Sequence, residues 1–213
     1  MFRTIVFLTL IWAPATLLAD TLFAQAASQY QLKPALLKSI AEMESQLHPW
    51  AVNLNWEGFK PRTKADAVAL VKATQNKPWL LRLDYPDTSQ RLFFRNRQDA
   101  AAALEQTKNN ATLLGINRPS DWEIRKLDTR SVDIGLMQIN WKFHGRHFDS
   151  LEQLFEPKTN VMYAAKYLHK LLRRHGSTER AVAFYHSNTQ QYQAKYLSLF
   201  RPIYQKQLIL ARR

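Results

Sequence analysis

The sequence of 213 residues contains no cysteine. Disulfide bonds, thiolate metal sites and cysteine nucleophiles are therefore excluded. Acidic residues are also scarce, with 17 against 30 basic residues, which gives a formal net charge of +13. This excess implies a polyanionic partner, which can be a nucleic acid, an anionic membrane or an acidic cell-wall polymer, and charge alone does not choose among them.

A long uninterrupted apolar run is missing as well. The most apolar stretch, residues 4–18, follows Arg3 and is broken by threonines and Pro14. It is short for a membrane span and is typical of a signal-peptide core. We expect residues 1–19 to be a signal peptide that is cleaved after Ala19, with no membrane span in the mature chain. The alternative is a retained N-terminal anchor, and both interpretations predict an exported domain.

The remaining sequence is sufficient for one globular domain, which we expect at residues 20–213. A hydrophobic content of 46% and an aromatic content of 12% argue against disorder. Helical periodicity predicts a mainly α (α+β) fold with helices at 20–30, 34–45, 63–74, 97–108, 158–175, from 177 or 178, and from about 190. The expected N-caps are Thr63, Asn96, and Ser177 or Thr178. Strands are expected at 79–84, 90–95 and 122–127, with a turn at 86–89 between the first two, and loops at 53–61 and 109–121. Residues 133–140 are ambiguous between a strand and the start of a helix.

A glutamate stands out near the end of the 34–45 helix. The apolar residues of this helix end with Ile40 and Ala41, and three or four positions further along the same face lies Glu44. Glu42 lies on the wetter side. Because a partly desolvated carboxyl group resists ionisation, Glu44 is a candidate acid for protonating the leaving oxygen of a glycosidic bond. From this stretch alone, a solvated or lysine-paired glutamate is the more ordinary interpretation.

Further motifs in the sequence favour the catalytic interpretation of Glu44. Four of them occur in order: Ile40-Ala41-x-x-Glu44-Ser45, Gly135-Leu136-Met137-Gln138-Ile139, Asn160, and Ala181-Val182-Ala183-Phe184-Tyr185. Together they resemble the lytic transglycosylases of the soluble-lytic-transglycosylase family, whose catalytic domain is lysozyme-like. The resemblance covers about residues 22–200. Residues 56–130 have no counterpart in the shortest members, and we interpret them as an insertion that contains a small β-hairpin.

The resemblance implies cleavage of the β-1,4 bond between N-acetylmuramic acid and N-acetylglucosamine in peptidoglycan. No water is added, because the muramyl 6-hydroxyl closes onto C1 and leaves a 1,6-anhydro end. Glu44 matches the single catalytic glutamate of the family, which acts first as acid and then as base. The acetamido group of the substrate can supply the charge stabilisation that a second carboxylate gives in other glycosidases. We expect a periplasmic location, no cofactor and no metal.

The resemblance also suggests residues that bind substrate. Ser45 either forms a hydrogen bond near the glutamate or is an ordinary polar residue at a helix end. Gly135 would let the backbone approach a sugar closely. Met137 and Gln138 match residues that line the cleft. Core packing is the competing role for Met137, whereas the amide of Gln138 suits sugar hydroxyl and N-acetyl groups.

Tyr185 matches a cleft tyrosine of the family that lies close to the glutamate, with a buried core tyrosine as the alternative. Many members follow this tyrosine with asparagine, whereas His186 and Ser187 follow it here. A histidine can still donate to a sugar, although its charge would vary with pH. His186 is therefore a substrate-binding candidate whose exact role the resemblance does not give.

Other polar groups have ordinary explanations. His144 and His147 are three residues apart, as in some metal pairs, yet we favour plain loop histidines. Asp133 is expected to cap the segment that begins at Gly135. The arginines at 91–97 flank two phenylalanines and could hold a polyanion by stacking and charge, although a solvated basic face is the default.

Three alternative functions stay open at this point. The first is a muramidase on the same fold that uses water instead of the 6-hydroxyl. The second is a cell-wall-binding component of a secretion, pilus or conjugation apparatus, in which catalysis is incidental. The third, an exported nucleic-acid-binding protein, is motivated only by charge, and we do not favour it.

Overall fold

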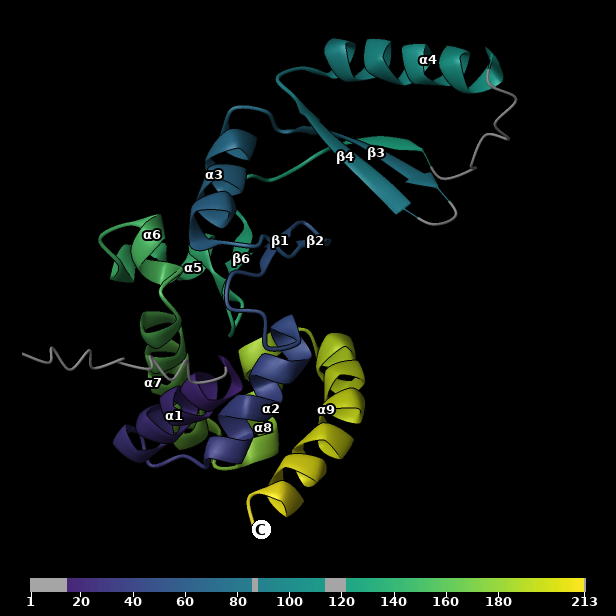
Figure 1. Ribbon diagram of the computed structural model, residues 1–213. Coiled ribbons are helices and arrows are strands. Elements are labelled where there is room, and N and C mark those ends of the chain that lie inside the picture. The colour runs from purple at the N-terminus through teal and green to yellow at the C-terminus, as the bar shows by residue number, and fades with distance from the viewer. Residues whose placement is uncertain (1–14, 86–87, 114–121, 213) are drawn as a thin grey trace, which may run out of the picture. The chain divides into compact units, whose positions relative to one another are not determined.

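The computed structural model describes residues 15–85, 88–113 and 122–212 (Figure 1). The helical elements are α1 (Ala15–Gln29), α2 (Pro34–Ser45), α3 (Lys64–Gln75), α4 (Arg97–Leu113), α5 (Trp141–His144), the 3₁₀ turn η1 (Gly145–His147), α6 (Leu151–Leu154), α7 (Pro157–His175), α8 (Thr178–His186) and α9 (Gln190–Leu210). The strands are β1 (Val52–Leu54), β2 (Glu57–Phe59), β3 (Trp79–Tyr85), β4 (Thr88–Phe94), β5 (Glu123–Lys126), β6 (Val132–Ile134) and β7 (Ile139–Asn140). The predicted mainly α (α+β) fold is confirmed, and its strands form small antiparallel sheets.

The predicted N-terminal caps explain where several helices begin. The side chain of Thr63 accepts a hydrogen bond from the backbone N–H of Asp66 at the start of α3 (3.1 Å). Asn96 accepts from the N–H of Asp99 at the start of α4 (2.8 Å). Ser177 does the same at the start of α8. Each cap satisfies a backbone donor that has no partner inside its helix.

The chain divides into two compact units. The first, here called the terminal unit, comprises Met1–Ile40 and Val161–Arg213, and the second, the central unit, comprises Ala41–Asn160. The terminal unit is helical, and its buried side chains include Phe23, Leu37, Leu168 and Phe200. Helix α1 begins at Ala15, so the predicted cleavage site after Ala19 lies inside this helix. In the part of the chain that the structure describes, no helix is both long and apolar enough to cross a membrane.

The central unit contains an antiparallel sheet of order β2-β1-β6-β7, in which Val52 pairs with Ile134. The predicted loop at 53–61 is therefore wrong, because β1 and β2 form a hairpin with a two-residue turn, Asn55-Trp56. Both turn residues have positive φ, 52° and 74°. Hairpins of this kind usually place glycine at the second position, and its absence here hides the turn from sequence analysis. The ambiguous residues 133–140 become β6, a turn and β7.

A second antiparallel sheet, of order β4-β3-β5, forms most of the predicted insertion. The strands expected at 79–84, 90–95 and 122–127 are confirmed as β3, β4 and β5. Helix α4 packs against this sheet (Figure 1) and extends to Leu113, beyond its predicted end. We call residues 79–126 the insertion lobe. The end of the predicted 109–121 loop and part of the predicted 86–89 turn lie outside the described residues.

Candidate active site

Helix α2 ends at Ser45 because the chain reverses direction directly after it. Gln46 and Leu47 have left-handed backbone conformations, with φ of 54° and 63°. The N–H of Leu47 donates to the carbonyl oxygen of Ala41 (3.2 Å), which closes the last helical turn. The helix therefore ends at Ser45, as the predicted range of 34–45 has it. Glu44 thus lies on the final turn of α2.

The two glutamates of this helix differ less in exposure than the sequence suggested. Glu44 is half-buried, and so is Glu42. One carboxylate oxygen of Glu44, Oε1, is completely shielded from solvent. A carboxyl group with one shielded oxygen beside accessible atoms can exchange a proton with a bound ligand while water has limited access to it.

Ser45 connects the end of α2 to the second motif. Its side chain is buried, and its hydroxyl lies 3.0 Å from the carbonyl oxygen of Ala41 and 2.9 Å from that of Leu136. Leu136 belongs to the turn between β6 and β7, which spans 135–138. Two motifs that are 91 residues apart in sequence therefore meet at this hydroxyl group.

The turn at 135–138 is fixed by its own hydrogen bonds. Its first residue, Gly135, has φ of 78° and its last, Gln138, has φ of 45°. The N–H of Gly135 donates to the carbonyl oxygen of Ala51 (2.8 Å). The side-chain amide nitrogen of Gln138 donates to the carbonyl oxygens of Gly135 (2.9 Å) and Ala51 (3.2 Å). The N–H end of this amide thus holds the turn, and its oxygen is the end that a ligand donor could use.

Asn160 supports the same turn from the start of α7. It is completely buried, and its Oδ1 accepts from the N–H of Met137 (2.8 Å). Its Nδ2 donates to the carbonyl oxygens of Ile134 (2.8 Å) and Leu154 (3.2 Å). A Cβ atom at position 135 would lie only 2.7 Å from this Nδ2. Glycine is therefore required by packing as well as by backbone conformation, and the side chain of Met137 is itself fully buried.

Tyr185 and His186 lie at the end of α8 in the terminal unit. The ring of Tyr185 lies 5.8 Å from that of Tyr167, and His186 stacks on Tyr196 at 4.1 Å. Burial raises the pKa of Tyr167, against the opposing effect of Arg174. His186 is exposed and Tyr185 is half-buried, so both have surface that a ligand can reach.

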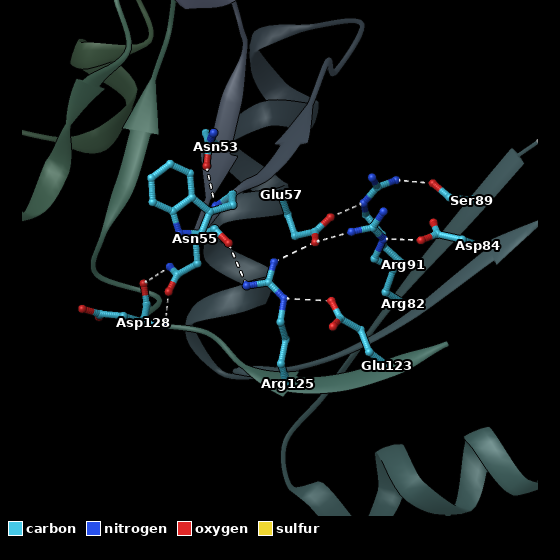
Figure 2. A network of polar contacts seen from close by, with 11 residues as sticks. Asn53, Asn55, Glu57, Arg82, Asp84, Ser89, Arg91, Glu123, Arg125 and Asp128 are labelled. Carbon is cyan, nitrogen blue, oxygen red and sulfur yellow. Dashed lines mark hydrogen bonds and ion pairs between the residues drawn. The ribbon is translucent and has the colours of Figure 1, made fainter. Parts of the chain in front are cut away.

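A buried acid that the sequence analysis missed is Glu57, on β2 (Figure 2). Its side chain is 2% exposed and forms ion pairs with Arg91 (2.7 Å), Arg125 (2.7 Å) and Arg82 (3.5 Å). Burial works to raise the pKa of Glu57, but hydrogen bonds from Arg91 and Arg125 and the nearby positive charges outweigh it and lower this pKa. We call these four residues the Glu57 cluster.

The Glu57 cluster joins two sheets of the central unit. Glu57 comes from the β1–β2 hairpin, and the three arginines come one each from β3, β4 and β5 of the insertion lobe. Arg91 was assigned by default to a solvated basic face, and that assignment is wrong, because it binds Glu57 and lies over the ring of Phe59. The sequence around Glu57 gives no local signal of this cluster, because Arg82, Arg91 and Arg125 lie 25, 34 and 68 positions further along the chain.

Two smaller expectations concern polar residues near the turn. The carboxylate of Asp133 accepts a hydrogen bond from the amide of Asn140 (2.8 Å), and its role as a cap of the segment at Gly135 stays a prediction. Burial lowers the pKa of His144, and the charges of His147 and Arg146 lower it further. Within the described residues, no group of three or more histidines or acids could hold a metal ion.

Positive charge is concentrated in the terminal unit. By sequence, this unit contains 13 basic and two acidic residues, whereas the central unit contains 17 basic and 15 acidic residues. Both acids of the terminal unit form ion pairs, Asp20 with Lys38 (2.7 Å) and Glu179 with Arg201 (2.8 Å). The remaining basic side chains give this unit the electrostatic character of a surface that binds polyanions.

Comparison with known proteins identifies the family. Neither the curated proteins nor the solved structures give a match. The family described as the transglycosylase SLT domain matches residues 21–198, a range that includes Glu44, the 135–138 turn, Asn160 and α8. The match covers most of the chain, insertion lobe included. The chain therefore belongs to the transglycosylase SLT domain family, with the lysozyme-like fold and the lytic-transglycosylase type of function, peptidoglycan cleavage, that this family has.

Proposed function

We propose that this protein cleaves the β-1,4 bond between N-acetylmuramic acid and N-acetylglucosamine without adding water, and that Glu44 is its catalytic acid and base. The observation that carries this proposal is the hydrogen bond between Ser45 and Leu136 (2.9 Å). It fixes the end of the helix that bears Glu44 against the turn that bears Gln138. A general acid beside a group that binds sugar amides and hydroxyls is the minimum that this chemistry needs.

The proposed reaction conserves its protons. Protonated Glu44 donates its proton to the bridging oxygen as the bond from that oxygen to C1 of the muramyl residue breaks. The acetamido group of the same sugar stabilises the positive charge that develops at C1. The muramyl 6-hydroxyl then forms a bond to C1, and its proton passes to the Glu44 carboxylate. The products are a 1,6-anhydromuramyl end and a free 4-hydroxyl, and Glu44 is again protonated.

The other proposed site residues bind or position the substrate. The amide oxygen of Gln138 would accept from a sugar hydroxyl or N-acetyl N–H, since its nitrogen is used within the turn. Gly135 and Met137 would shape the turn, and Ser45 would position Glu44. Tyr185 and His186 are proposed to contact substrate with their accessible surface. No cofactor takes part in this proposal.

We also infer that the protein acts in the periplasm after export. The apolar run at residues 4–18 behind Arg3 supports this inference. Peptidoglycan strands are the substrate in that compartment, and the proposed partner is an assembly apparatus of the cell envelope.

The test is mass spectrometry of the products released from purified peptidoglycan. Wild-type protein should release muropeptides with 1,6-anhydro ends, and Glu44→Gln should release none while keeping its fold. Glu42→Gln is the matched control, because Glu42 lies on the same helix and is also half-buried, and it should cleave like the wild type. Equal loss of activity in both variants would contradict the assignment of Glu44.

The same experiment separates the alternatives. Products with reducing ends would identify a muramidase that admits water to C1. Binding to peptidoglycan with no product from the wild type would favour a wall-binding component of an assembly apparatus.

A further inference from the structure

The tip of the β1–β2 hairpin presents a tryptophan to solvent. Trp56 is 83% exposed, the largest exposed fraction among the large hydrophobic side chains that the structure describes as exposed. An exposed indole contributes little to the core of a protein. Its position therefore needs an explanation other than packing.

The backbone at this position makes the choice of tryptophan more unusual. Trp56 has φ of 74°, in the left-handed region that glycine adopts readily and bulky residues rarely adopt. It occupies the second position of a turn whose preferred sequence is Asn-Gly. Asn55 is present at the first position, but the glycine is replaced by the largest side chain available. Backbone strain of this kind clusters at functional sites, which makes a function of the Trp56 side chain a hypothesis worth testing.

The surrounding polar contacts hold the hairpin tip in one conformation. The N–H of Trp56 donates to the side chain of Asn53 (3.0 Å). The side chain of Asn55 exchanges two hydrogen bonds with the backbone of Asp128, both 2.9 Å. The backbone carbonyl oxygen of Asn55 accepts a third hydrogen bond, from the side chain of Arg125 (2.8 Å). Figure 2 shows these contacts beside the buried Glu57, the residue that follows the tryptophan. The indole is thus presented on a fixed support, which reduces the ordering cost of binding a ligand.

We propose that Trp56 is a stacking platform for a sugar ring of the glycan strand, at a subsite away from the bond that is cleaved. The apolar C–H face of a pyranose packs against the flat face of an indole, and the rim of the sugar keeps its hydroxyl and N-acetyl groups in water. An N-acetylated glycan is the polymer on which this family acts, so it is the ligand that such a platform would meet. This inference rests on the proposed function for the identity of the polymer.

The sheet register places Trp56 away from the 135–138 turn. Ile134, which precedes Gly135, pairs with Val52, whereas Leu54 next to the hairpin turn pairs with Val132. The two turns therefore lie at opposite ends of the paired segment. At about 3.3 Å per residue, Asn55 lies about 13 Å along the strand from Ala51, which bonds to Gly135. A glycan strand long enough to span this distance would gain a contact with Trp56 that a short glycan fragment lacks.

The test measures glycan binding separately from cleavage, in the Glu44→Gln protein. Calorimetry with peptide-free peptidoglycan strands compares this parent with versions that also carry Trp56→Gly, Trp56→Phe or Phe143→Ala. Phe143 is a matched control because it is another strongly exposed aromatic residue of the central unit, at 65%. We expect Trp56→Gly to weaken binding about tenfold, the order expected for loss of one aromatic stacking contact. Trp56→Phe should keep most of the affinity, and Phe143→Ala should keep all of it.

Thermal unfolding separates binding from structure. Trp56→Gly should melt at or above the temperature of the parent, because glycine suits this φ value. A lower melting temperature, unchanged glycan affinity, or equal weakening by Phe143→Ala would overturn the proposal. So would a parent that binds no glycan. If the wild type fails to cleave peptidoglycan while Trp56 still governs binding, the proposed reaction fails and the platform stands.

Discussion

The hydroxyl group of Ser45 lies 2.9 Å from the carbonyl oxygen of Leu136, so a single side chain joins the helix of Glu44 to the turn of Gln138. Both groups are buried. The hydrogen bond gives the serine next to the glutamate a physical role, because it fixes the last turn of α2 against the 135–138 turn. Any loosening of this bond should change the position of Glu44.

Ser45→Ala should therefore reduce turnover more than it reduces substrate binding. The buried carbonyl oxygen of Leu136 loses a donor, which should lower the free energy of unfolding by about 1–2 kcal/mol. Ser39→Ala is the matched control, since Ser39 is equally buried but donates only to Ala35 in its own helix (2.6 Å). Urea denaturation and cleavage kinetics measure the two effects. Equal loss of turnover in both variants would contradict a positioning role for Ser45.

Gly135→Ala should destabilise the protein through a collision with Asn160. The new Cβ would lie 2.7 Å from Nδ2 of Asn160, whose three hydrogen bonds prevent it from moving away. Strain at the positive φ adds to this overlap, and the combined loss should be about 2–4 kcal/mol. Gly58→Ala is the control, because a Cβ atom added there would have no other atom within 4 Å. Thermal unfolding of the two variants should differ clearly, and similar melting temperatures would refute the packing argument.

Local sequence signals predicted much of the fold. The caps at Thr63, Asn96 and Ser177 are found because an N-cap depends on one side chain and a backbone donor a few residues away. The β1–β2 hairpin was missed because the sequence lacks the glycine that usually marks such a turn. The predicted end of α2 at residue 45 is confirmed, but the left-handed conformations of Gln46 and Leu47 that follow it are not favoured by their residue types.

The candidate site was predictable in its residues and much less so in its contacts. Family motifs point to Glu44, Ser45 and the 135–138 turn, but the bond from Ser45 to Leu136 spans 91 positions and has no local signal. The contact between Gly135 and Asn160 also joins distant positions and has no local signal in the sequence. Glu57 escaped notice because its burial depends on three arginines from another sheet. Contacts between distant segments are set by tertiary packing, which propensity and periodicity do not contain.

Glu57→Gln should destabilise the central unit by about 3–5 kcal/mol at neutral pH, because three arginines lose a buried partner. The pKa of Glu57 is lowered in the folded state from its usual value of 4.5. Its contribution is therefore fully present above that value and is lost as pH falls through the lowered pKa. The difference in unfolding free energy between wild type and variant should stay constant near pH 7 and shrink below about pH 4.5. Glu123→Gln, at a half-exposed partner of Arg125, should change little at either pH.

Binding to peptidoglycan should weaken as salt rises, because the terminal unit carries most of the net positive charge. Lys166→Gln combined with Lys170→Gln removes two exposed charges from α7 in that unit. Lys77→Gln combined with Lys126→Gln removes two exposed charges from the central unit. Sedimentation with insoluble peptidoglycan should show the larger loss of binding for the α7 pair. Equal losses of binding in the two double variants would mean that peptidoglycan affinity depends on the overall charge of the protein and is independent of the unit that carries it.

Removal of the insertion lobe should leave the chemistry intact, provided that Glu57 is changed with it. The ends of the lobe are close together, since the N–H of Leu127 donates to the carbonyl oxygen of Pro78 (2.8 Å), so a short glycine-serine linker can replace residues 79–126. The deletion alone removes all three arginines from a carboxylate that is 2% exposed, and such a protein should be strongly destabilised. The deletion combined with Glu57→Leu removes the unpaired charge and should fold. That variant should cleave short glycans at a rate near that of the wild type and should lose activity mainly on long strands. A folded double variant without activity on short glycans would show that the lobe takes part in the reaction itself.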